Sequence, residues 1–370
     1  MQDVMQPKGM DFVRLAIAMA LGKDGVKQAG ILATQRWGED SMPARIMKAG
    51  GPALLATKAE VPAGATGGAN WAAELIDLES ASTEFFALVR ERSLIGRIEG
   101  LRRIPLRTRL VNAVSGFSAA WVGEGKAKPV SSATYDENTL PSRKIVSLAV
   151  VTNELIESAD PAAEQLIHTD MVNAMVAALD QSFIDPVNTG EAGVEPAAVT
   201  NGAASEDVVG TGDVDDFRQS ISYLAGQFGG DLTRAVLIGR PELFVHIANQ
   251  PFRFPSLGAR GGELVGIPAF ATKALPIVGG LQQLVLLDAD SIAIGEGEMD
   301  LRVSRQGTIE MLDSSLTGDS VGVVPGTAAS TVSLFQTNST AILYEKRINW
   351  QVARPGGVAV LTGLDYGGIS

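Results

Sequence analysis

Large apolar side chains recur every four residues between positions 160 and 185, and this spacing predicts a single long helix. Pro161 suits the first turn, where its missing N–H group costs nothing, and the pair Asp185-Pro186 ends the pattern. The apolar stripe consists of Ile167, Met171, Met175, Leu179 and Phe183. We expect these five residues to form the buried core along the helix.

Strand-like segments flank a polar stretch just before this helix. Leu101–Val111 alternates arginine with aliphatic residues, Phe117–Val122 is apolar, and Lys144–Val151 resumes the strand pattern. The residues between them, Gly123–Thr139, are polar and rich in turn formers. This pattern predicts an extended hairpin. It holds too few apolar residues for a core of its own, so we expect it to find a partner on another chain.

Helical and strand patterns alternate over residues 200–325, as in a compact α+β domain. The predicted helices are Phe217–Gln227 and Pro241–Asn249, and the predicted strands are Arg234–Ile238, Leu264–Thr272, Leu284–Leu287 and Ser291–Ile294. Strand character returns near the C-terminus, at Val332–Tyr344, Ile348–Val352 and Val358–Leu361. Near the N-terminus, helices are predicted over Met10–Leu21 and Trp71–Arg90. The Gly-, Ala- and Pro-rich residues between those two helices predict an extended arm.

Composition fits a globular chain of two or three domains, because 45% of the 370 residues are hydrophobic and 19% are charged. The formal net charge of -12 disfavours free-standing binding of nucleic acid, which needs an excess of lysine and arginine. If the protein meets DNA, we expect it to enclose the DNA rather than to grip it. A membrane-spanning helix needs a run of about 18 apolar residues, and the sequence contains no such run.

Motifs for catalysis or cofactor binding do not occur in the sequence. The chain has no cysteine, which excludes disulfides, thiolate catalysis and cysteine-based zinc sites. Its histidines, His168 and His246, lie in helical patterns far apart in sequence, and we interpret both as structural. There is no phosphate-binding loop and no nucleophile elbow. We therefore expect no enzyme activity, no metal and no cofactor.

The segment Ala119–Asp160 combines a tryptophan, Gly-Glu-Gly, Lys-Pro, a polar loop and a strand that leads into a short Glu-rich helix. This order resembles the E-loop and following strand of tailed-phage major capsid proteins. Val265–Pro276 and Ile342–Leu361 resemble two further segments of that family, and the similarity covers about residues 70–366 in the right order. The E-loop residues that the resemblance assigns to assembly are Trp121, Glu124, Lys126, Lys128 and Pro129.

The resemblance implies an α+β fold, the Hong Kong 97-type phage capsid fold, with four parts. These are an N-terminal arm with helices (1–99), an extended E-loop hairpin (100–149), a peripheral domain with a long spine helix at 160–185 (150–199 and 329–370) and an axial domain (200–328). It further implies a homo-oligomer of pentamers and hexamers that forms an icosahedral virion shell in the bacterial host cytoplasm. Such a shell encloses double-stranded DNA without reading its sequence. A portal protein, a scaffold or maturation protease, and a decoration or cement protein would be its partners, and no membrane is involved.

Some relatives in that family cross-link covalently through a lysine, an asparagine and a glutamate. Asn338 and Glu345 stand at the asparagine and glutamate positions, whereas the lysine position falls at Gly125, with Lys126 one residue along. A one-residue offset on a strand turns a side chain to the opposite face. We therefore expect no cross-link.

Two other interpretations remain open from the sequence. The same fold could form an encapsulin-like cellular nanocompartment around a protein cargo, or a gene-transfer particle. A different class of protein, an α+β enzyme with an unrecognised site, predicts a monomer or small oligomer with a deep polar pocket. Particle size separates the enzyme from the shells, and packaged DNA separates a phage-type shell from a nanocompartment.

Overall fold

A computed structural model gives the fold and describes residues 9–22, 25–49, 84–115, 134–157, 161–208, 214–249, 254, 256–311 and 330–364. The chain divides into two compact units, each assembled from three separate stretches of sequence. The first unit comprises Met1–Ser93, Ile145–Ala178 and Glu298–Lys346. The second unit comprises Leu94–Lys144, Leu179–Gly297 and Arg347–Ser370.

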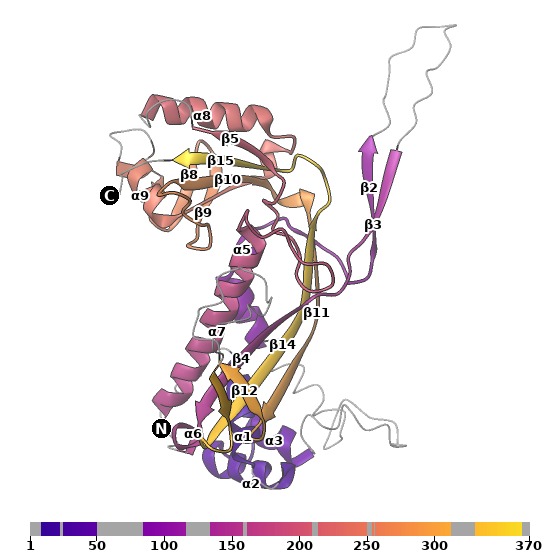
Figure 1. The fold of residues 1–370 in the computed structure, drawn as a ribbon, viewed down its shortest axis with the longest axis vertical. Helices are drawn as coiled ribbons and strands as arrows, with labels where there is room; N and C mark the ends of the chain where they lie inside the picture. Colours follow the sequence, from indigo (N-terminus) through magenta and orange to yellow (C-terminus); the bar gives the residue numbers. More distant parts are fainter. Residues whose placement is uncertain are drawn as a thin grey trace, which may run out of the picture. The chain divides into compact units, whose positions relative to one another are not determined.

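The first unit combines helices with strands (Figure 1). Its helices are α1 (Met10–Leu21), α2 (Val26–Trp37), α3 (Met42–Ala49), a helical stretch at 84–92, α6 (Asn153–Glu157) and most of α7 (Pro161–Ile184). Its strands are β4 (Lys144–Thr152), β12 (Thr308–Met311), β13 (Ser330–Ser333) and parts of β11 (Ile292–Ser304) and β14 (Ser339–Val352). β12 and β13 pair as an antiparallel ribbon. The bounds of α7 confirm the long helix predicted from the four-residue spacing.

Aromatic rings hold the core of the first unit together. Phe12 of α1 stacks on Phe85 with ring centroids 4.8 Å apart, and Phe85 meets Tyr344 of β14 edge-on at 6.3 Å. The Tyr344 hydroxyl donates to the backbone carbonyl of Met171 on α7 at 3.5 Å. All three rings are almost fully buried, so this cluster ties α1, the 84–92 helix, α7 and β14 into one body.

The N-terminal region is more helical than predicted. The expected extended arm after Leu21 is wrong for the described residues 26–49, which form α2 and α3. Gly30 lies inside α2, where an added Cβ would come within 3.3 Å of the backbone of Met47 and Lys48. The glycine therefore permits close packing of two helices rather than an extended chain. The predicted helix Trp71–Arg90 is observed from residue 84, and its earlier residues lie outside the described part.

The second unit is built on a seven-stranded sheet in the order β5-β15-β10-β6-β9-β8-β7. Those strands are β5 (Ala204–Asp207), β6 (Ala235–Gly239), β7 (Leu257–Gly258), β8 (Gly261–Leu264), β9 (Ile267–Ala271), β10 (Gln282–Asp288) and β15 (Val358–Leu364). Its helices are α5 (Leu94–Arg97), α8 (Val214–Gln227), α9 (Pro241–Asn249) and the end of α7, with short 3-10 turns at Leu232–Arg234 and Ala289–Ser291. The helix predicted at Pro241–Asn249 is confirmed with the same bounds.

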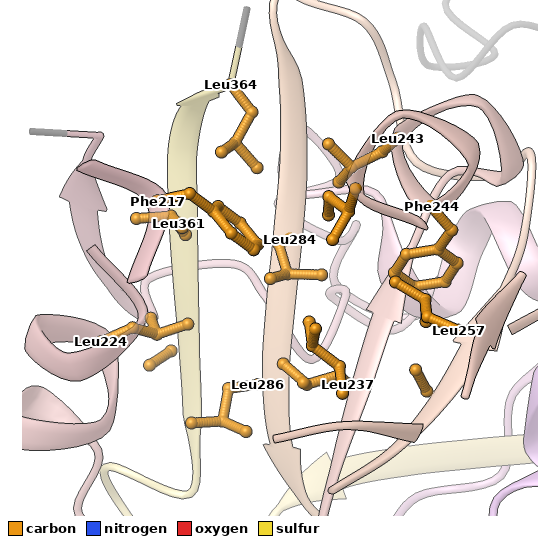
Figure 2. Close-up of a cluster of buried hydrophobic side chains, with 14 of the residues drawn as sticks. Phe217, Leu224, Leu237, Leu243, Phe244, Leu257, Leu284, Leu286, Leu361 and Leu364 are labelled. Atoms are coloured by element: carbon orange, nitrogen blue, oxygen red, sulfur yellow. The ribbon is translucent and has the colours of Figure 1, made fainter. Parts of the chain in front are cut away.

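Aliphatic and aromatic side chains from the sheet and from α8 and α9 make the core of this unit (Figure 2). Leu284 and Leu286 of β10 belong to the same buried cluster as Phe217 of α8 and Phe244 of α9. These four side chains are at most 2% exposed. Burying a side chain of this size contributes about 1.5–3 kcal/mol, so this cluster accounts for much of the stability of the second unit.

Three strand predictions are corrected by the structure. Leu101–Val111 is not one strand, because the chain turns through Arg107 (φ 64°) between β1 (Arg102–Arg103) and β2 (Arg109–Ser115). The returning arm of the hairpin is β3 (Thr134–Thr139), which pairs antiparallel with β2. β4, the predicted returning arm, instead joins a four-stranded sheet in the order β1-β11-β14-β4.

The C-terminal part departs from the predicted peripheral domain, which was to include all of 329–370. β15 pairs antiparallel with β10 and parallel with β5, so it belongs to the seven-stranded sheet of the second unit. The predicted strand Val332–Tyr344 is interrupted as well. Asn338 adopts φ 47° in a turn that separates β13 from β14.

We predict that Met175→Asp unfolds the subunit. Met175 is fully buried on α7, and an unpaired buried carboxylate costs several kcal/mol. Ala177→Asp is the matched control, since residue 177 is exposed on the same helix. Circular dichroism melting should show a cooperative transition for the control and none for Met175→Asp. Equal melting temperatures for the two variants would contradict the role assigned to Met175.

Candidate assembly surfaces

The hairpin of β2 and β3 is the first candidate surface. Its register pairs Arg109 with Thr139 and continues to Ser115 opposite Thr134, with an irregularity after Ala113. The two strands form a sheet of their own and join no other sheet among the described residues. The residues predicted for assembly, Trp121, Glu124, Lys126, Lys128 and Pro129, lie outside the described residues, so their role stays a prediction.

The root of this hairpin is a small apolar cluster on β11. Leu106 and Leu140 pack against Gly295, where an added Cβ would lie 2.7 Å and 2.8 Å from their side chains. Leu140 is fully buried, and Gly297 receives the other methyl group of Leu106. Glycine at both positions therefore makes the cradle into which the hairpin root is seated.

Backbone hydrogen bonds fix the same root. The N–H of Arg107 donates to the carbonyl of Leu140 at 2.8 Å, and the N–H of Ile104 donates to Ile294 of β11 at 2.9 Å. The left-handed conformation of Arg107 lets the chain leave β1 and enter β2. This conformation is unusual for a residue with a side chain and is sustained here by the surrounding contacts.

The long helix α7 supplies the second group of predicted residues. The five stripe residues are all buried, with exposed fractions of 7% for Ile167, 2% for Met171, 0% for Met175, 1% for Leu179 and 0% for Phe183. In the second unit, Phe183 also meets Trp350 edge-on at 5.5 Å. The stripe therefore packs inside the subunit and offers no surface to a partner.

Glu164, in the first turns of α7, binds side chains of α1 and α2 and so holds these helices against α7 within the first unit. Its carboxylate accepts hydrogen bonds from Arg14 Nε at 3.2 Å, Arg36 Nε at 3.1 Å and Trp37 Nε1 at 3.1 Å. The Arg36 guanidinium also donates to the carbonyl of Ile156 at 2.8 Å. A buried carboxylate is stable only when its acceptors are filled in this way. Sequence analysis could not identify these contacts, because the partners of Glu164 are 127–150 residues away along the chain.

Asp180 is a second buried acid on α7, and sequence analysis missed it. Its carboxylate accepts the N–H of Leu94 at 2.8 Å, which holds the start of α5. Burial raises the pKa of Asp180 to about 7, although that hydrogen bond and the charge of Arg97 act in the opposite direction. Arg97 in turn donates to the carbonyl of Ala271 on β9 at 2.9 Å. Asp180 thus belongs to a chain of contacts that reaches the seven-stranded sheet.

Asn338 and Glu345, which stand at the positions that some family members use for a cross-link, lie on the turn before β14 and on β14 itself. The Asn338 side-chain oxygen accepts from Asn153 Nδ2 at 2.8 Å, and its backbone carbonyl accepts the Asn153 N–H at 2.9 Å. Thr340 Oγ1 donates to Oδ1 of the same Asn153 side chain at 2.5 Å. Asn338 therefore closes a turn inside the subunit. The absence of a cross-link stays a prediction.

The two histidines of the chain lie in separate helices. His168 is buried and meets Phe85 edge-on at 6.2 Å, and His246 lies within α9. Over the described ranges, no group of three acidic, histidine or cysteine side chains is placed to hold a metal ion. None of the helices described there is long and apolar enough to cross a membrane.

Comparison with known proteins gives one consistent result. Residues 75–363 match the phage capsid family. A capsid polyprotein of Pseudomonas phage PAJU2 is 33% identical over 376 residues, which cover 97% of this chain and 54% of that protein. A major capsid protein of Klebsiella oxytoca phage phiKO2 is 22% identical over 77% of this chain and 67% of its own length. The chain thus spans about half the length of the first relative and two thirds of the second.

A solved structure from Mycobacterium phage Ogopogo has the same fold. It superimposes with a TM-score of 0.50 at 17% identity and covers 73% of this chain and 92% of its own. Together with the family match, this similarity confirms the predicted α+β phage capsid fold.

We predict that Gly295→Ala loosens the hairpin root. The new methyl group would displace Leu106 and Leu140, and overpacking of this kind costs about 1–3 kcal/mol. Hydrogen exchange should accelerate at the amides of Arg107 and Leu140. Gly226→Ala on α8 is the control, because a Cβ there meets nothing within 4 Å. Unchanged exchange at the root in Gly295→Ala would show that the cradle does not hold the hairpin.

We predict that Asp180 makes the subunit less stable as the pH rises. The folded pKa of about 7 lies above the ordinary value of 3.8, so between these values unfolding releases a proton and stability falls with rising pH. The stability contributed by protonated Asp180 is therefore fully present below pH 3.8 and fully lost above about pH 7, and the difference amounts to a few kcal/mol. Asp180→Asn keeps an acceptor for Leu94 and should remove this dependence in urea unfolding at pH 5 to 8. Asp185→Asn is the control and should follow the wild-type dependence of stability on pH. If Asp180→Asn also follows the wild-type dependence, the role assigned to Asp180 is wrong.

Proposed function

Because the chain belongs to the phage capsid family, we propose that it is a major capsid protein whose copies build an icosahedral shell around double-stranded DNA. The observation that carries the proposal is the β2–β3 hairpin, which is firmly rooted on β11 but pairs with no further strand among the described residues. A hairpin of two strands is marginal alone, and a second copy can supply the missing contacts.

The edge of the four-stranded sheet offers a second surface for such contacts. β4 is its last strand, and Val146 and Leu148 on that strand are 44% and 46% exposed. An apolar edge strand of this length invites pairing or packing with another chain. Several modest surfaces on each copy sum to a stable assembly, because the contacts are made at the same time.

The charge of the chain supports enclosure of DNA rather than specific binding to it. With a formal net charge of -12, the subunit has no electrostatic drive toward phosphate. In this proposal the shell consists of pentamers and hexamers of one chain, forms in the host cytoplasm and becomes part of the virion. A portal protein, a scaffold or maturation protease and a decoration protein are proposed partners on the strength of the family alone. No catalytic role is proposed.

Deleting Gly123–Thr139 tests the proposal. This deletion removes β3 and most of the segment between the two arms, and it removes no residue of the hydrophobic cluster formed by the seven-stranded sheet, α8 and α9. We predict that the variant melts cooperatively like the wild type but forms no closed particles in negative-stain microscopy and light scattering. The wild type should form shells some tens of nanometres across that protect DNA from nuclease.

Other outcomes decide between the alternatives. Normal particles from the deletion variant would refute the assembly role of the hairpin. Wild-type shells that hold protein and no DNA would identify a nanocompartment, whereas a wild-type chain that stays monomeric under all conditions would refute the capsid function.

A further inference from the structure

Helices α1, α2 and α3 come before residue 50 and pack within the first unit against elements that come after residue 83 (Figure 1). α1 is buried on almost every side. Five of its large apolar side chains are at most 4% exposed, namely Met10, Phe12, Val13, Leu15 and Ile17. If α1 left the unit, all of this apolar surface would enter water, so the packed state is strongly favoured.

The helical stretch at 84–92 provides the apolar part of the surface that receives α1. Phe12 stacks on Phe85 with ring centroids 4.8 Å apart, and both side chains are at most 1% exposed. The two backbones also come close, because a Cβ added to Gly9, directly before α1, would lie 3.0 Å from the Phe85 Cα. This contact joins residues that lie on opposite sides of the segment 50–83 in the sequence.

Glu164 of α7 provides the charged part of the same surface. Its side chain is 6% exposed and forms ion pairs with Arg14 of α1 at 3.2 Å and Arg36 of α2 at 3.1 Å. The two arginine side chains are themselves only 17% and 13% exposed, so solvent and salt weaken these pairs little. Arg36 also donates to the carbonyl of Ile156 on α6 at 2.8 Å. Departure of the helices would remove both cations from Glu164.

The three helices also hold together among themselves. A Cβ added to Gly30 of α2 would lie 3.3 Å from the backbone of Met47 on α3, so these two helices are in close contact. Ala33, Ala44, Ile46 and Met47 are at most 3% exposed. Helices α1–α3 therefore stay or leave as one body, and their separate contacts with the rest of the unit act at the same time.

None of the contacts named above involves a residue of the segment 50–83. We propose that helices α1–α3 stay docked on the first unit when the chain is cut between residues 49 and 84. The surface formed by Phe85, Glu164 and the Ile156 carbonyl then binds them without a covalent connection. In the proposed shell, a maturation protease that cuts in this segment leaves the N-terminal helices in place, and this consequence rests on the proposed capsid function.

Cleavage of the full chain at an engineered site tests the inference. A recognition sequence for a site-specific protease replaces Ala63–Gly68, and complete cutting is verified under denaturing conditions. At micromolar concentration, the fragment that carries α1–α3 should elute together with the rest of the chain in size-exclusion chromatography. The two parts should separate in urea. Separate elution without denaturant would overturn the inference.

Glu164→Gln in the cut chain tests the charged part of the surface. Glutamine keeps the size of the side chain and an acceptor for Trp37, but it removes the charge that Arg14 and Arg36 balance. The fragment, labelled with a fluorophore at its N-terminus, should dissociate about tenfold faster or more from this variant. Asp170→Asn is the matched control, because Asp170 is exposed on the same helix, and it should leave the dissociation rate unchanged. Equal rates in the two variants would overturn the role of Glu164 in this surface.

Measurements on particles separate this inference from the capsid function. Where particles form, cutting them should leave the fragment and the remainder of the chain in equal amounts in the sedimented material. Loss of the fragment from intact particles would overturn the inference and leave the capsid function standing. A chain that forms no particles would refute the capsid function, whereas the elution of cut subunits would still decide whether the helices stay docked.

Discussion

Backbone hydrogen bonding along β2 and β3 sets the main constraint on this molecule. Each strand uses one edge to bind the other, and in the described part of the chain the outer edges meet no further strand. Such a ribbon buries little apolar surface, so its own contacts contribute little stability. The hairpin is instead held at its root, where Leu106 and Leu140 pack against glycines of β11. In the proposed function, another copy of the chain supplies the stability that the rest of the hairpin lacks.

Assembly through projecting elements works only if the bodies that carry them are rigid. In the first unit, the aromatic cluster around Phe85 and the three donors on Glu164 hold four helices and β14 together. In the second unit, the side chains between β10 and helices α8 and α9 do the same. A rigid body loses less entropy on association, so several small contacts with neighbours suffice. The two buried acids of α7 differ in how the protein accommodates their negative charge. Glu164 is neutralised by cations, whereas burial of Asp180 makes its charged form unfavourable.

Sequence analysis succeeded where a repeating pattern reports local burial. The spacing from Ile167 to Phe183 gave the bounds of α7, and the proline start of α9 gave that helix without error. It failed where contacts between residues far apart in the sequence determine the local structure. Nothing in TYDENT (134–139) signals a strand, because its partner is β2 rather than a core. The Gly-, Ala- and Pro-rich composition after Leu21 predicted an extended arm, whereas Gly30 permits tight packing of α2 on α3. The roles of Glu164 and Asp180 depend on Arg14 and Leu94, which only the folded chain brings to them.

Hydrogen exchange at the amides of β2 and β3, compared between free subunits and assembled particles, tests the central claim most directly. If identical copies complete the hairpin, amides that face outward on Arg109–Ser115 and Thr134–Thr139 should exchange quickly in the free subunit. In the particle they should become strongly protected, while the Arg107 amide at the root should be protected in both states. Equal exchange of the outward amides in both states would mean that no neighbour pairs with the hairpin, and the account would be wrong.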